Sequence, residues 1–235
     1  ELKYPWSVAF LPEGGYLVAM RTGELRRVSL SGGAGPPLTG LPESYVLGQG
    51  GYFDIALDPN FTDNRFVYLA FAYGTPDLNG TRVVKGKLGR SSVENIQTIF
   101  DVMPKKDTPL HYGGKLQFLQ DGTLLLTTGD GFEYREAAQD PFNLLGKIIR
   151  IHSDGTIPSD NPFASGQNGH PAVWSYGHRN PQGLAQDSET GEVFMHEHGA
   201  KGGDELNRVT PGLNYGWPAV TKGVNYSGAY VSPLR

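Results

Sequence analysis

The stretch KLQFLQDGTLLLTTGD, residues 115–130, decides the fold, because it places an apolar run on each side of a polar turn. Two apolar runs joined by a short turn rich in Asp and Gly predict a β-hairpin. The same layout recurs in three other segments, which read SVAFLPEGGYLVAM (7–20), DIALDPNFTDNRFVYLAF (54–71) and GLAQDSETGEVFMHEHG (183–199). The sequence therefore predicts a protein built from four similar β-units.

A further strand-like run follows each hairpin, at 23–30, 81–88, 146–155 and 204–212. The hairpin turns begin near residues 12, 58, 120 and 187, so the unit repeats about every 45 to 70 residues. Repeats of that size with about four strands each are typical of propeller blades. We expect residues 1–235 to form a single all-β propeller domain, with an irregular β-sandwich as the alternative.

The composition agrees with an all-β protein. Of 235 residues, 38% are hydrophobic, and 33 glycines and 17 prolines indicate many tight turns and few long helices. A short helix is expected within 135–146, where Pro141 limits it to one or two turns.

Several function classes are disfavoured by what the sequence lacks. The net charge of −4 comes without a basic tract, so nucleic acid is not an expected partner, and no apolar run approaches membrane length. The absence of cysteine excludes disulfides, thiolate catalysis and Cys-ligated metal sites. There is no Gly-x-Gly-x-x-Gly, Walker or Gly-x-Ser-x-Gly motif, which argues against nicotinamide, nucleotide and serine-esterase chemistry.

The segment SYGHRNPQGLA, residues 175–185, gathers His178, Arg179 and Asn180 just before Pro181. A proline at that point disfavours both a helix and a central strand. The three polar side chains are therefore expected on a loop or strand end, where a rigid scaffold orients functional groups.

Three more polar residues precede or end predicted strands. His111 stands before a Gly pair, and its near-neutral pKa as a residue type suits a general base, although a surface histidine is the common alternative. Asp130 follows the apolar strand 123–128. There it could orient a neighbouring histidine, or it could be an ordinary turn residue. Gln49 lies between two glycines, which lets a ligand approach the backbone or simply makes a turn.

The segment EHGAKGGDELN, residues 197–207, combines carboxylates with glycines. Asp204 and Glu205, together with free backbone carbonyls, offer the oxygen ligands that calcium prefers. His196 and His198 offer a zinc alternative, but no third ligand is obvious, so zinc is disfavoured.

With these motifs the chain resembles the soluble pyrroloquinoline quinone (PQQ)-dependent aldose sugar dehydrogenases, the glucose/sorbosone dehydrogenase family. The resemblance covers the whole chain in family order, through PWSVAFLPEG, GQGGYFDIALDPNF, HYGGKLQF, GKIIRI, SDNPF, WSYGHRNPQGLA, EHGAKGGDELN and NYGWP. It implies a six-bladed β-propeller, of which this chain carries about the first four blades, and a periplasmic or secreted enzyme that oxidises aldoses to lactones.

The resemblance also implies roles for individual residues. His111 matches the base that takes the proton from the anomeric hydroxyl while a hydride moves to PQQ, and Asp130 matches the acid that orients it. Gln49 matches a residue beside cofactor and substrate. Arg179 and Asn180 match residues that contact the quinone, where a permanent positive charge stabilises developing oxyanion character.

A calcium cofactor is implied in the same way. Backbone carbonyls at Gly199 and Ala200 match calcium ligands beside the quinone. Glu205 and the carbonyl of Tyr215 match a second calcium site, and Asp204 matches an acid near the substrate. The partners implied are a sugar and an external electron acceptor.

Three positions depart from the family pattern. Ala200 stands where proline is common, Lys115 stands where arginine is common, and the loop GDGFEYRE differs after Asp130. The carbonyl ligand survives the first change, whereas the third alters the surroundings of the substrate.

Two alternatives remain beside the dehydrogenase. One is a non-catalytic propeller that binds sugars or proteins, and the other is a calcium-dependent lactonase. The set His111, Asp130, Arg179 and Asn180 favours the dehydrogenase, because a binding module has no need of it. A chain of four blades is expected to bind PQQ weakly by itself, unless strand 7–11 pairs with 204–230 to close a ring.

Overall fold

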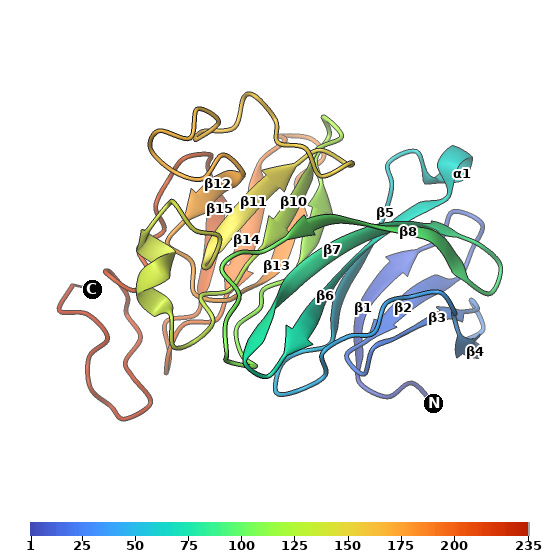
Figure 1. Ribbon diagram of the computed structural model, residues 1–235, viewed down its shortest axis with the longest axis horizontal. Helices are drawn as coiled ribbons and strands as arrows, with labels where there is room; N and C mark the ends of the chain where they lie inside the picture. Colours follow the sequence, from blue (N-terminus) through green and yellow to red (C-terminus); the bar gives the residue numbers. More distant parts are fainter. Residues whose placement is uncertain (235) are drawn as a thin grey trace.

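The computed structural model describes residues 1–234 as four antiparallel sheets, arranged side by side as propeller blades (Figure 1). The first blade consists of β1 (Pro5–Phe10), β2 (Tyr16–Met20), β3 (Glu24–Val28) and β4 (Ala34–Pro37). The second consists of β5 (Tyr52–Leu57), β6 (Phe66–Thr75), β7 (Leu78–Leu88) and β8 (Val93–Asp101). The third consists of β9 (Leu116–Phe118), β10 (Leu124–Thr127), β11 (Lys147–Ile151) and β12 (Val173–Tyr176). The fourth consists of β13 (Pro181–Gln186), β14 (Val193–Glu197) and β15 (Glu205–Val209).

The prediction of an all-β propeller is confirmed. All four expected hairpins form, and the strand-like run after each of them becomes β3, β7, β11 or β15. Within residues 1–234, helical structure is limited to α1 (Phe61–Asn64) and a 3-10 turn at Arg135–Gln139, which ends before Pro141 as expected. No helix in residues 1–234 combines the length and apolar character needed to cross a bilayer.

The first strand of each blade lies nearest its neighbours, so that β1 contacts β5, β5 contacts β9 and β9 contacts β13. These four strands therefore form the inner edge of an arc. Within residues 1–234, no strand pairing joins β1 to β13, β14 or β15, and the two ends of the chain lie on opposite sides of the molecule (Figure 1). The pairing of 7–11 with 204–230 that would close a four-bladed ring is absent.

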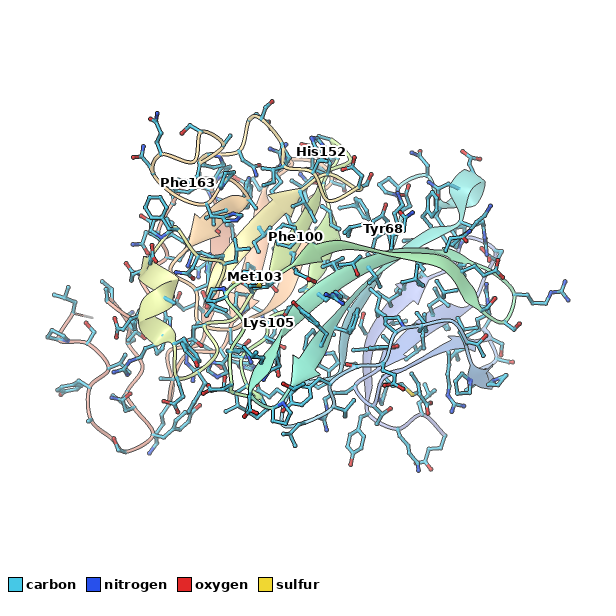
Figure 2. The ribbon with its side chains drawn as sticks, viewed as in Figure 1. Tyr68, Phe100, Met103, Lys105, His152 and Phe163 are labelled. Carbon is cyan, nitrogen blue, oxygen red and sulfur yellow. The ribbon has the colours of Figure 1, made fainter. Side chains whose placement is uncertain are left out.

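The hydrophobic core consists of three clusters, one at each junction between successive blades. Leu124 and Leu126 of β10 pack toward the second blade, whereas Leu125 packs toward the fourth. Because successive side chains of a strand point to opposite faces, a blade covered on both faces needs an uninterrupted apolar run. Tyr68 and Phe100 of the second blade, with Phe163 of the third, belong to the middle cluster and are labelled in Figure 2.

Asp54 of β5 ties the inner strands of three blades together. Its carboxylate accepts hydrogen bonds from the Ser7 hydroxyl of β1 and, at 2.8 Å, from the backbone N–H of Leu116 of β9. The ammonium group of Lys115 lies 2.9 Å away. Since Asp54 is 2% exposed, this buried carboxylate gains its full set of partners only when the three blades are docked.

Candidate active site

The polar residues singled out in the sequence gather where the inner strands begin. Residues 178–180 directly precede β13, which starts at Pro181, so their predicted place at a strand end is confirmed. His111 lies just before β9, and Gln49 just before β5. Because the inner strands adjoin one another, these loops from different blades meet at one face of the arc.

His111 and Asp130 form a buried pair. The Nδ1 atom of His111 lies 2.6 Å from Oδ1 of Asp130, and the two residues are 5% and 0% exposed. Since a carboxylate only accepts hydrogen bonds, Nδ1 carries the proton and Nε2 is the free nitrogen. Nε2 has no hydrogen-bond partner within residues 1–234.

Asp130 is held by three further hydrogen bonds. Its Oδ1 accepts the backbone N–H of Phe132 at 2.8 Å, and its Oδ2 accepts the indole N–H of Trp217 at 2.7 Å. Its own backbone N–H donates to the carbonyl of Arg179 at 2.8 Å. The carboxylate is therefore fixed from both sides, and it fixes the orientation of the His111 ring.

The backbone at His111 adopts φ of 48°, a left-handed conformation that is uncommon outside glycine. Its N–H donates to Oε1 of Gln49 at 2.8 Å. Three residues on, Gly114 has φ of 95°, and a Cβ atom there would lie 2.5 Å from the side chain of Phe53. The Gly pair after His111 thus lets this loop cross close to the second blade.

Lys106 lies at the base of the same loop and is 3% exposed. Its Nζ donates to Oδ1 of Asn79 at 3.1 Å and to the carbonyl of Thr108, and it lies 3.5 Å from the centre of the Tyr112 ring. Burial lowers the pKa of Lys106 to about 7, against a smaller opposing effect of the Asp130 charge. A titrating amine is therefore packed behind the His111–Asp130 pair.

Arg179 is a buried cation, 4% exposed, and none of the ion pairs within residues 1–234 includes it. Its guanidinium donates to the carbonyls of His198, at 3.2 Å, and Gly199, and lies 5.3 Å from the ring centre of Trp217. It lines a cavity, here called the Arg179 cavity, together with Phe132, Glu133, Arg135, Ala200, Trp217, Asn225 and Tyr226. A buried charge without a counter-ion favours an anionic ligand.

Asn180 and Gln49 line a neighbouring cavity, here called the central cavity, with Trp6, Arg21, Phe53, Gly113, Gln182 and His198 among its other walls. The Oδ1 atom of Asn180 accepts the backbone N–H of Gly113 at 3.2 Å and the amide of Gln182 at 3.0 Å. The Nδ2 group of Asn180 makes no hydrogen bond within residues 1–234, which leaves two donors for a ligand.

His178, next to Arg179, serves the scaffold. Its Nε2 lies 2.8 Å from the Ser175 hydroxyl and its Nδ1 lies 3.0 Å from Oε1 of Glu197. The other oxygen of Glu197 accepts the backbone N–H of Arg179 at 2.5 Å. Ser175 and His178 are 0% exposed, so this Ser–His–Glu row positions Arg179 and cannot reach a substrate.

The implied calcium ligands fall into two groups. Glu205 and Tyr215 line one cavity, here called the Glu205 cavity, while Gly199 and Ala200 lie beside Arg179. Burial raises the pKa of Glu205, and the nearby Glu197 charge adds to the effect. Within residues 1–234 no three His, Asp or Glu side chains are grouped as metal ligands, and the calcium sites stay a prediction.

Asp204 lies apart from the His111–Asp130 pair. It lines the Glu205 cavity, its side chain is 70% exposed, and its Oδ1 accepts the backbone N–H of Gly199 at 2.9 Å. Its position near the substrate therefore stays a prediction, and its visible contact is with the loop that carries Gly199.

Three residues of the site were not predicted from the sequence. Trp217 belongs to the NYGWP segment, but its bond to Asp130 joins residues 87 positions apart. Lys106 stands in the polar run KKD, which gives no sign of burial. Phe132 was noted only as part of the loop GDGFEYRE, which departs from the family pattern. The bulky side chain directly after Gly131 was the sequence feature that could have singled it out.

The fold and this site define a β-propeller with a histidine–carboxylate pair and a buried arginine at the start of its inner strands. The profile of the Glucose / Sorbosone dehydrogenase family matches residues 2–234, and the chain belongs to that family.

Two relatives illustrate the similarity. The aldose sugar dehydrogenase YliI of Escherichia coli is 41% identical over 232 residues, which cover 97% of this chain and 62% of YliI. The quinoprotein glucose dehydrogenase B of Acinetobacter calcoaceticus is 28% identical over 234 residues, which cover 87% of this chain and 48% of that protein. The chain spans about three fifths of the curated relatives that it matches at 41% or 42% identity.

Solved structures agree. The soluble aldose sugar dehydrogenase of E. coli in its apo-form has a TM-score of 0.93 at 41% identity, covering 97% of this chain and 67% of that one. The PQQ-bound form of aldose sugar dehydrogenase from Streptomyces coelicolor has a TM-score of 0.85 at 33% identity, covering 98% and 67%. The expected family is therefore confirmed, as is the expectation that this chain corresponds to about two thirds of such a propeller.

Proposed function

We propose that this chain carries the base, its orienting acid and the anion-binding arginine of a PQQ-dependent aldose dehydrogenase. The observation that carries the proposal is the buried His111–Asp130 pair beside an uncompensated Arg179. A base with one free nitrogen and a cation without a counter-ion suit a reaction that removes a proton and develops negative charge nearby.

The residues present fit PQQ, which is planar and carries three carboxylates. Arg179 supplies a buried positive charge, and Asn180 supplies an amide with free donors. Trp217 and Tyr226 supply aromatic surface in the Arg179 cavity. When bound, PQQ would supply the two-electron acceptor, for the hydride of the anomeric carbon, that no amino-acid side chain offers.

In this reaction, the Nε2 atom of His111 takes the proton of the anomeric hydroxyl. Asp130 keeps the proton of the imidazole on Nδ1, so that Nε2 stays available, and Trp217 and Phe132 keep Asp130 in place. Gln49 holds the backbone of His111, and as a wall of the neighbouring central cavity it can contact the bound cofactor and sugar. The product is a lactone.

Calcium would be held by the carbonyls of Gly199 and Ala200 beside the cofactor. A second ion would be held by Glu205 and the carbonyl of Tyr215, where it would remove the cost of burying the Glu205 charge. Asp204 would lie near the substrate. We further propose a periplasmic or secreted location and an external electron acceptor, on the basis of the family.

An absorbance titration tests the proposal. PQQ and calcium are added to the protein that contains residues 1–235, and the spectrum is followed on addition of an aldose. Conversion of the oxidised to the reduced quinone spectrum, with release of lactone, supports the proposal. Tight PQQ binding without any sugar-dependent reduction would indicate a binding module, and lactone hydrolysis without PQQ would indicate a lactonase.

A further inference from the structure

Phe132 lines the Arg179 cavity and also makes a ring contact with His111. It lies in the loop after β10, and its backbone adopts φ of 70°. This left-handed conformation is a genuine outlier for a bulky side chain and persists only where the surroundings determine it. The contacts of the Phe132 ring should therefore show what holds its backbone in this conformation.

The strained backbone is tied to the pair that the proposed reaction uses. The N–H of Phe132 donates to Oδ1 of Asp130, the same oxygen that lies 2.6 Å from His111 Nδ1. In this conformation the ring of Phe132 meets the His111 ring edge to face, with 5.1 Å between ring centres and 81° between planes. The ring position and the His111 orientation therefore depend on each other.

On its other side, Phe132 forms part of an aromatic wall. The ring of Tyr226 lies roughly parallel to it, at 6.5 Å between centres and 27° between planes. Arg179, Asn225 and Glu133 offer polar groups around the same cavity. The cavity thus combines an apolar face with a polar rim, which suits a ligand that has one apolar face and polar edges.

We propose that Phe132 is a specificity-determining residue that stacks against the apolar face of a pyranose ring beside His111. This inference rests on the proposed function. A pyranose whose hydroxyls are equatorial presents axial C–H groups on its face and hydroxyls along its edge. Phe132 therefore favours such aldoses over sugars whose axial hydroxyl would point at the ring and lose hydrogen bonds there.

Kinetics of three variants test the stacking role in the protein that contains residues 1–235. Phe132→Tyr keeps the ring and should retain activity. Phe132→Ala and Phe132→Gly should raise KM for an all-equatorial aldose roughly 10- to 100-fold, with a smaller change for an aldose carrying an axial hydroxyl. Phe142→Ala, on an exposed ring outside the cavity, is the matched control and should leave KM unchanged.

The backbone provides a readout that does not need the cofactor. Glycine tolerates a positive φ and alanine does not, so Phe132→Gly should melt about 2–4 °C above Phe132→Ala. Equal melting temperatures would contradict the strained conformation from which the ring position follows.

Binding of a 1-deoxy aldose, which has no anomeric hydroxyl to oxidise, separates this inference from the proposed function. Saturation of aromatic protons should transfer to the sugar in wild type and Phe132→Tyr but fall at least severalfold in Phe132→Gly. An unchanged transfer and KM would overturn the role of Phe132 while leaving PQQ-dependent oxidation intact. Loss of PQQ affinity with unchanged sugar binding would overturn it as well, because the ring would then be stacking on the cofactor.

Discussion

Lys147 of β11 is 0% exposed, and replacing it with methionine should change how the stability of the protein depends on pH. Its Nζ donates to the carbonyls of Ala137, Ala138 and Leu145, at 2.8, 3.2 and 2.5 Å. Burial lowers the pKa of Lys147 from 10.5 to about 7. Between these two values the unfolded chain binds a proton that the folded chain does not.

The sign of the effect follows from that difference. Between pH 7 and 10.5 folding releases this proton, and a higher pH favours the release, so the free energy of unfolding rises by about 1.4 kcal/mol per pH unit. Across the whole interval this amounts to about 5 kcal/mol. Lys147→Met lacks this contribution, so the destabilisation that it causes should be small near pH 7 and should grow by about 1.4 kcal/mol per unit above it.

Urea denaturation at pH 7, 8 and 9, followed by tryptophan fluorescence, measures the difference between wild type and variant. Lys87→Met is the control, because Lys87 is exposed and its replacement should give curves parallel to those of wild type. A difference between wild type and Lys147→Met that stays constant from pH 7 to 9 would show that Lys147 is charged throughout, and would refute the reasoning.

Three further predictions concern the site and the core. His111→Ala should leave PQQ binding nearly intact and lower kcat by about 10²–10⁴, measured by stopped-flow reduction of the bound quinone; a loss of PQQ affinity with normal turnover would contradict its role as base. Arg179→Lys should weaken PQQ binding and lower kcat by about 10², because lysine lacks the planar fork of donors, and a fully active variant would contradict this. Leu125→Ala, at the junction of the third and fourth blades, should cost about 2–5 kcal/mol in urea denaturation, whereas Leu206→Ala, whose side chain is 76% exposed, should cost little.

Local pattern was enough to predict the blades and the place of the polar residues. The hairpins predicted from turns such as Leu119–Gly122 form as expected. Pro181 predicted that His178, Arg179 and Asn180 lie at a strand end, since proline is disfavoured within a central strand, and β13 indeed begins at Pro181. The roles of these residues stay predictions.

Contacts between distant residues were beyond the sequence. The hydrogen bond from Trp217 to Asp130 and the burial of Lys106 depend on how blades and loops pack, which no local pattern records. The left-handed backbone at Phe132 was equally hidden, because propensity alone disfavours it at an aromatic residue.

The bonds of Asp54 have a consequence for how the protein folds. Its carboxylate accepts hydrogen bonds from Ser7, 47 residues earlier, and from Leu116, 62 residues later. During synthesis, the first two blades emerge before Leu116 does, so docking them tightly would bury a carboxylate that still lacks its third-blade partners. The cost of that burial delays final docking until the third blade has been made. We therefore expect the blades to dock late and together. Because the contacts that join them connect residues far apart in the sequence, we expect folding to be slow.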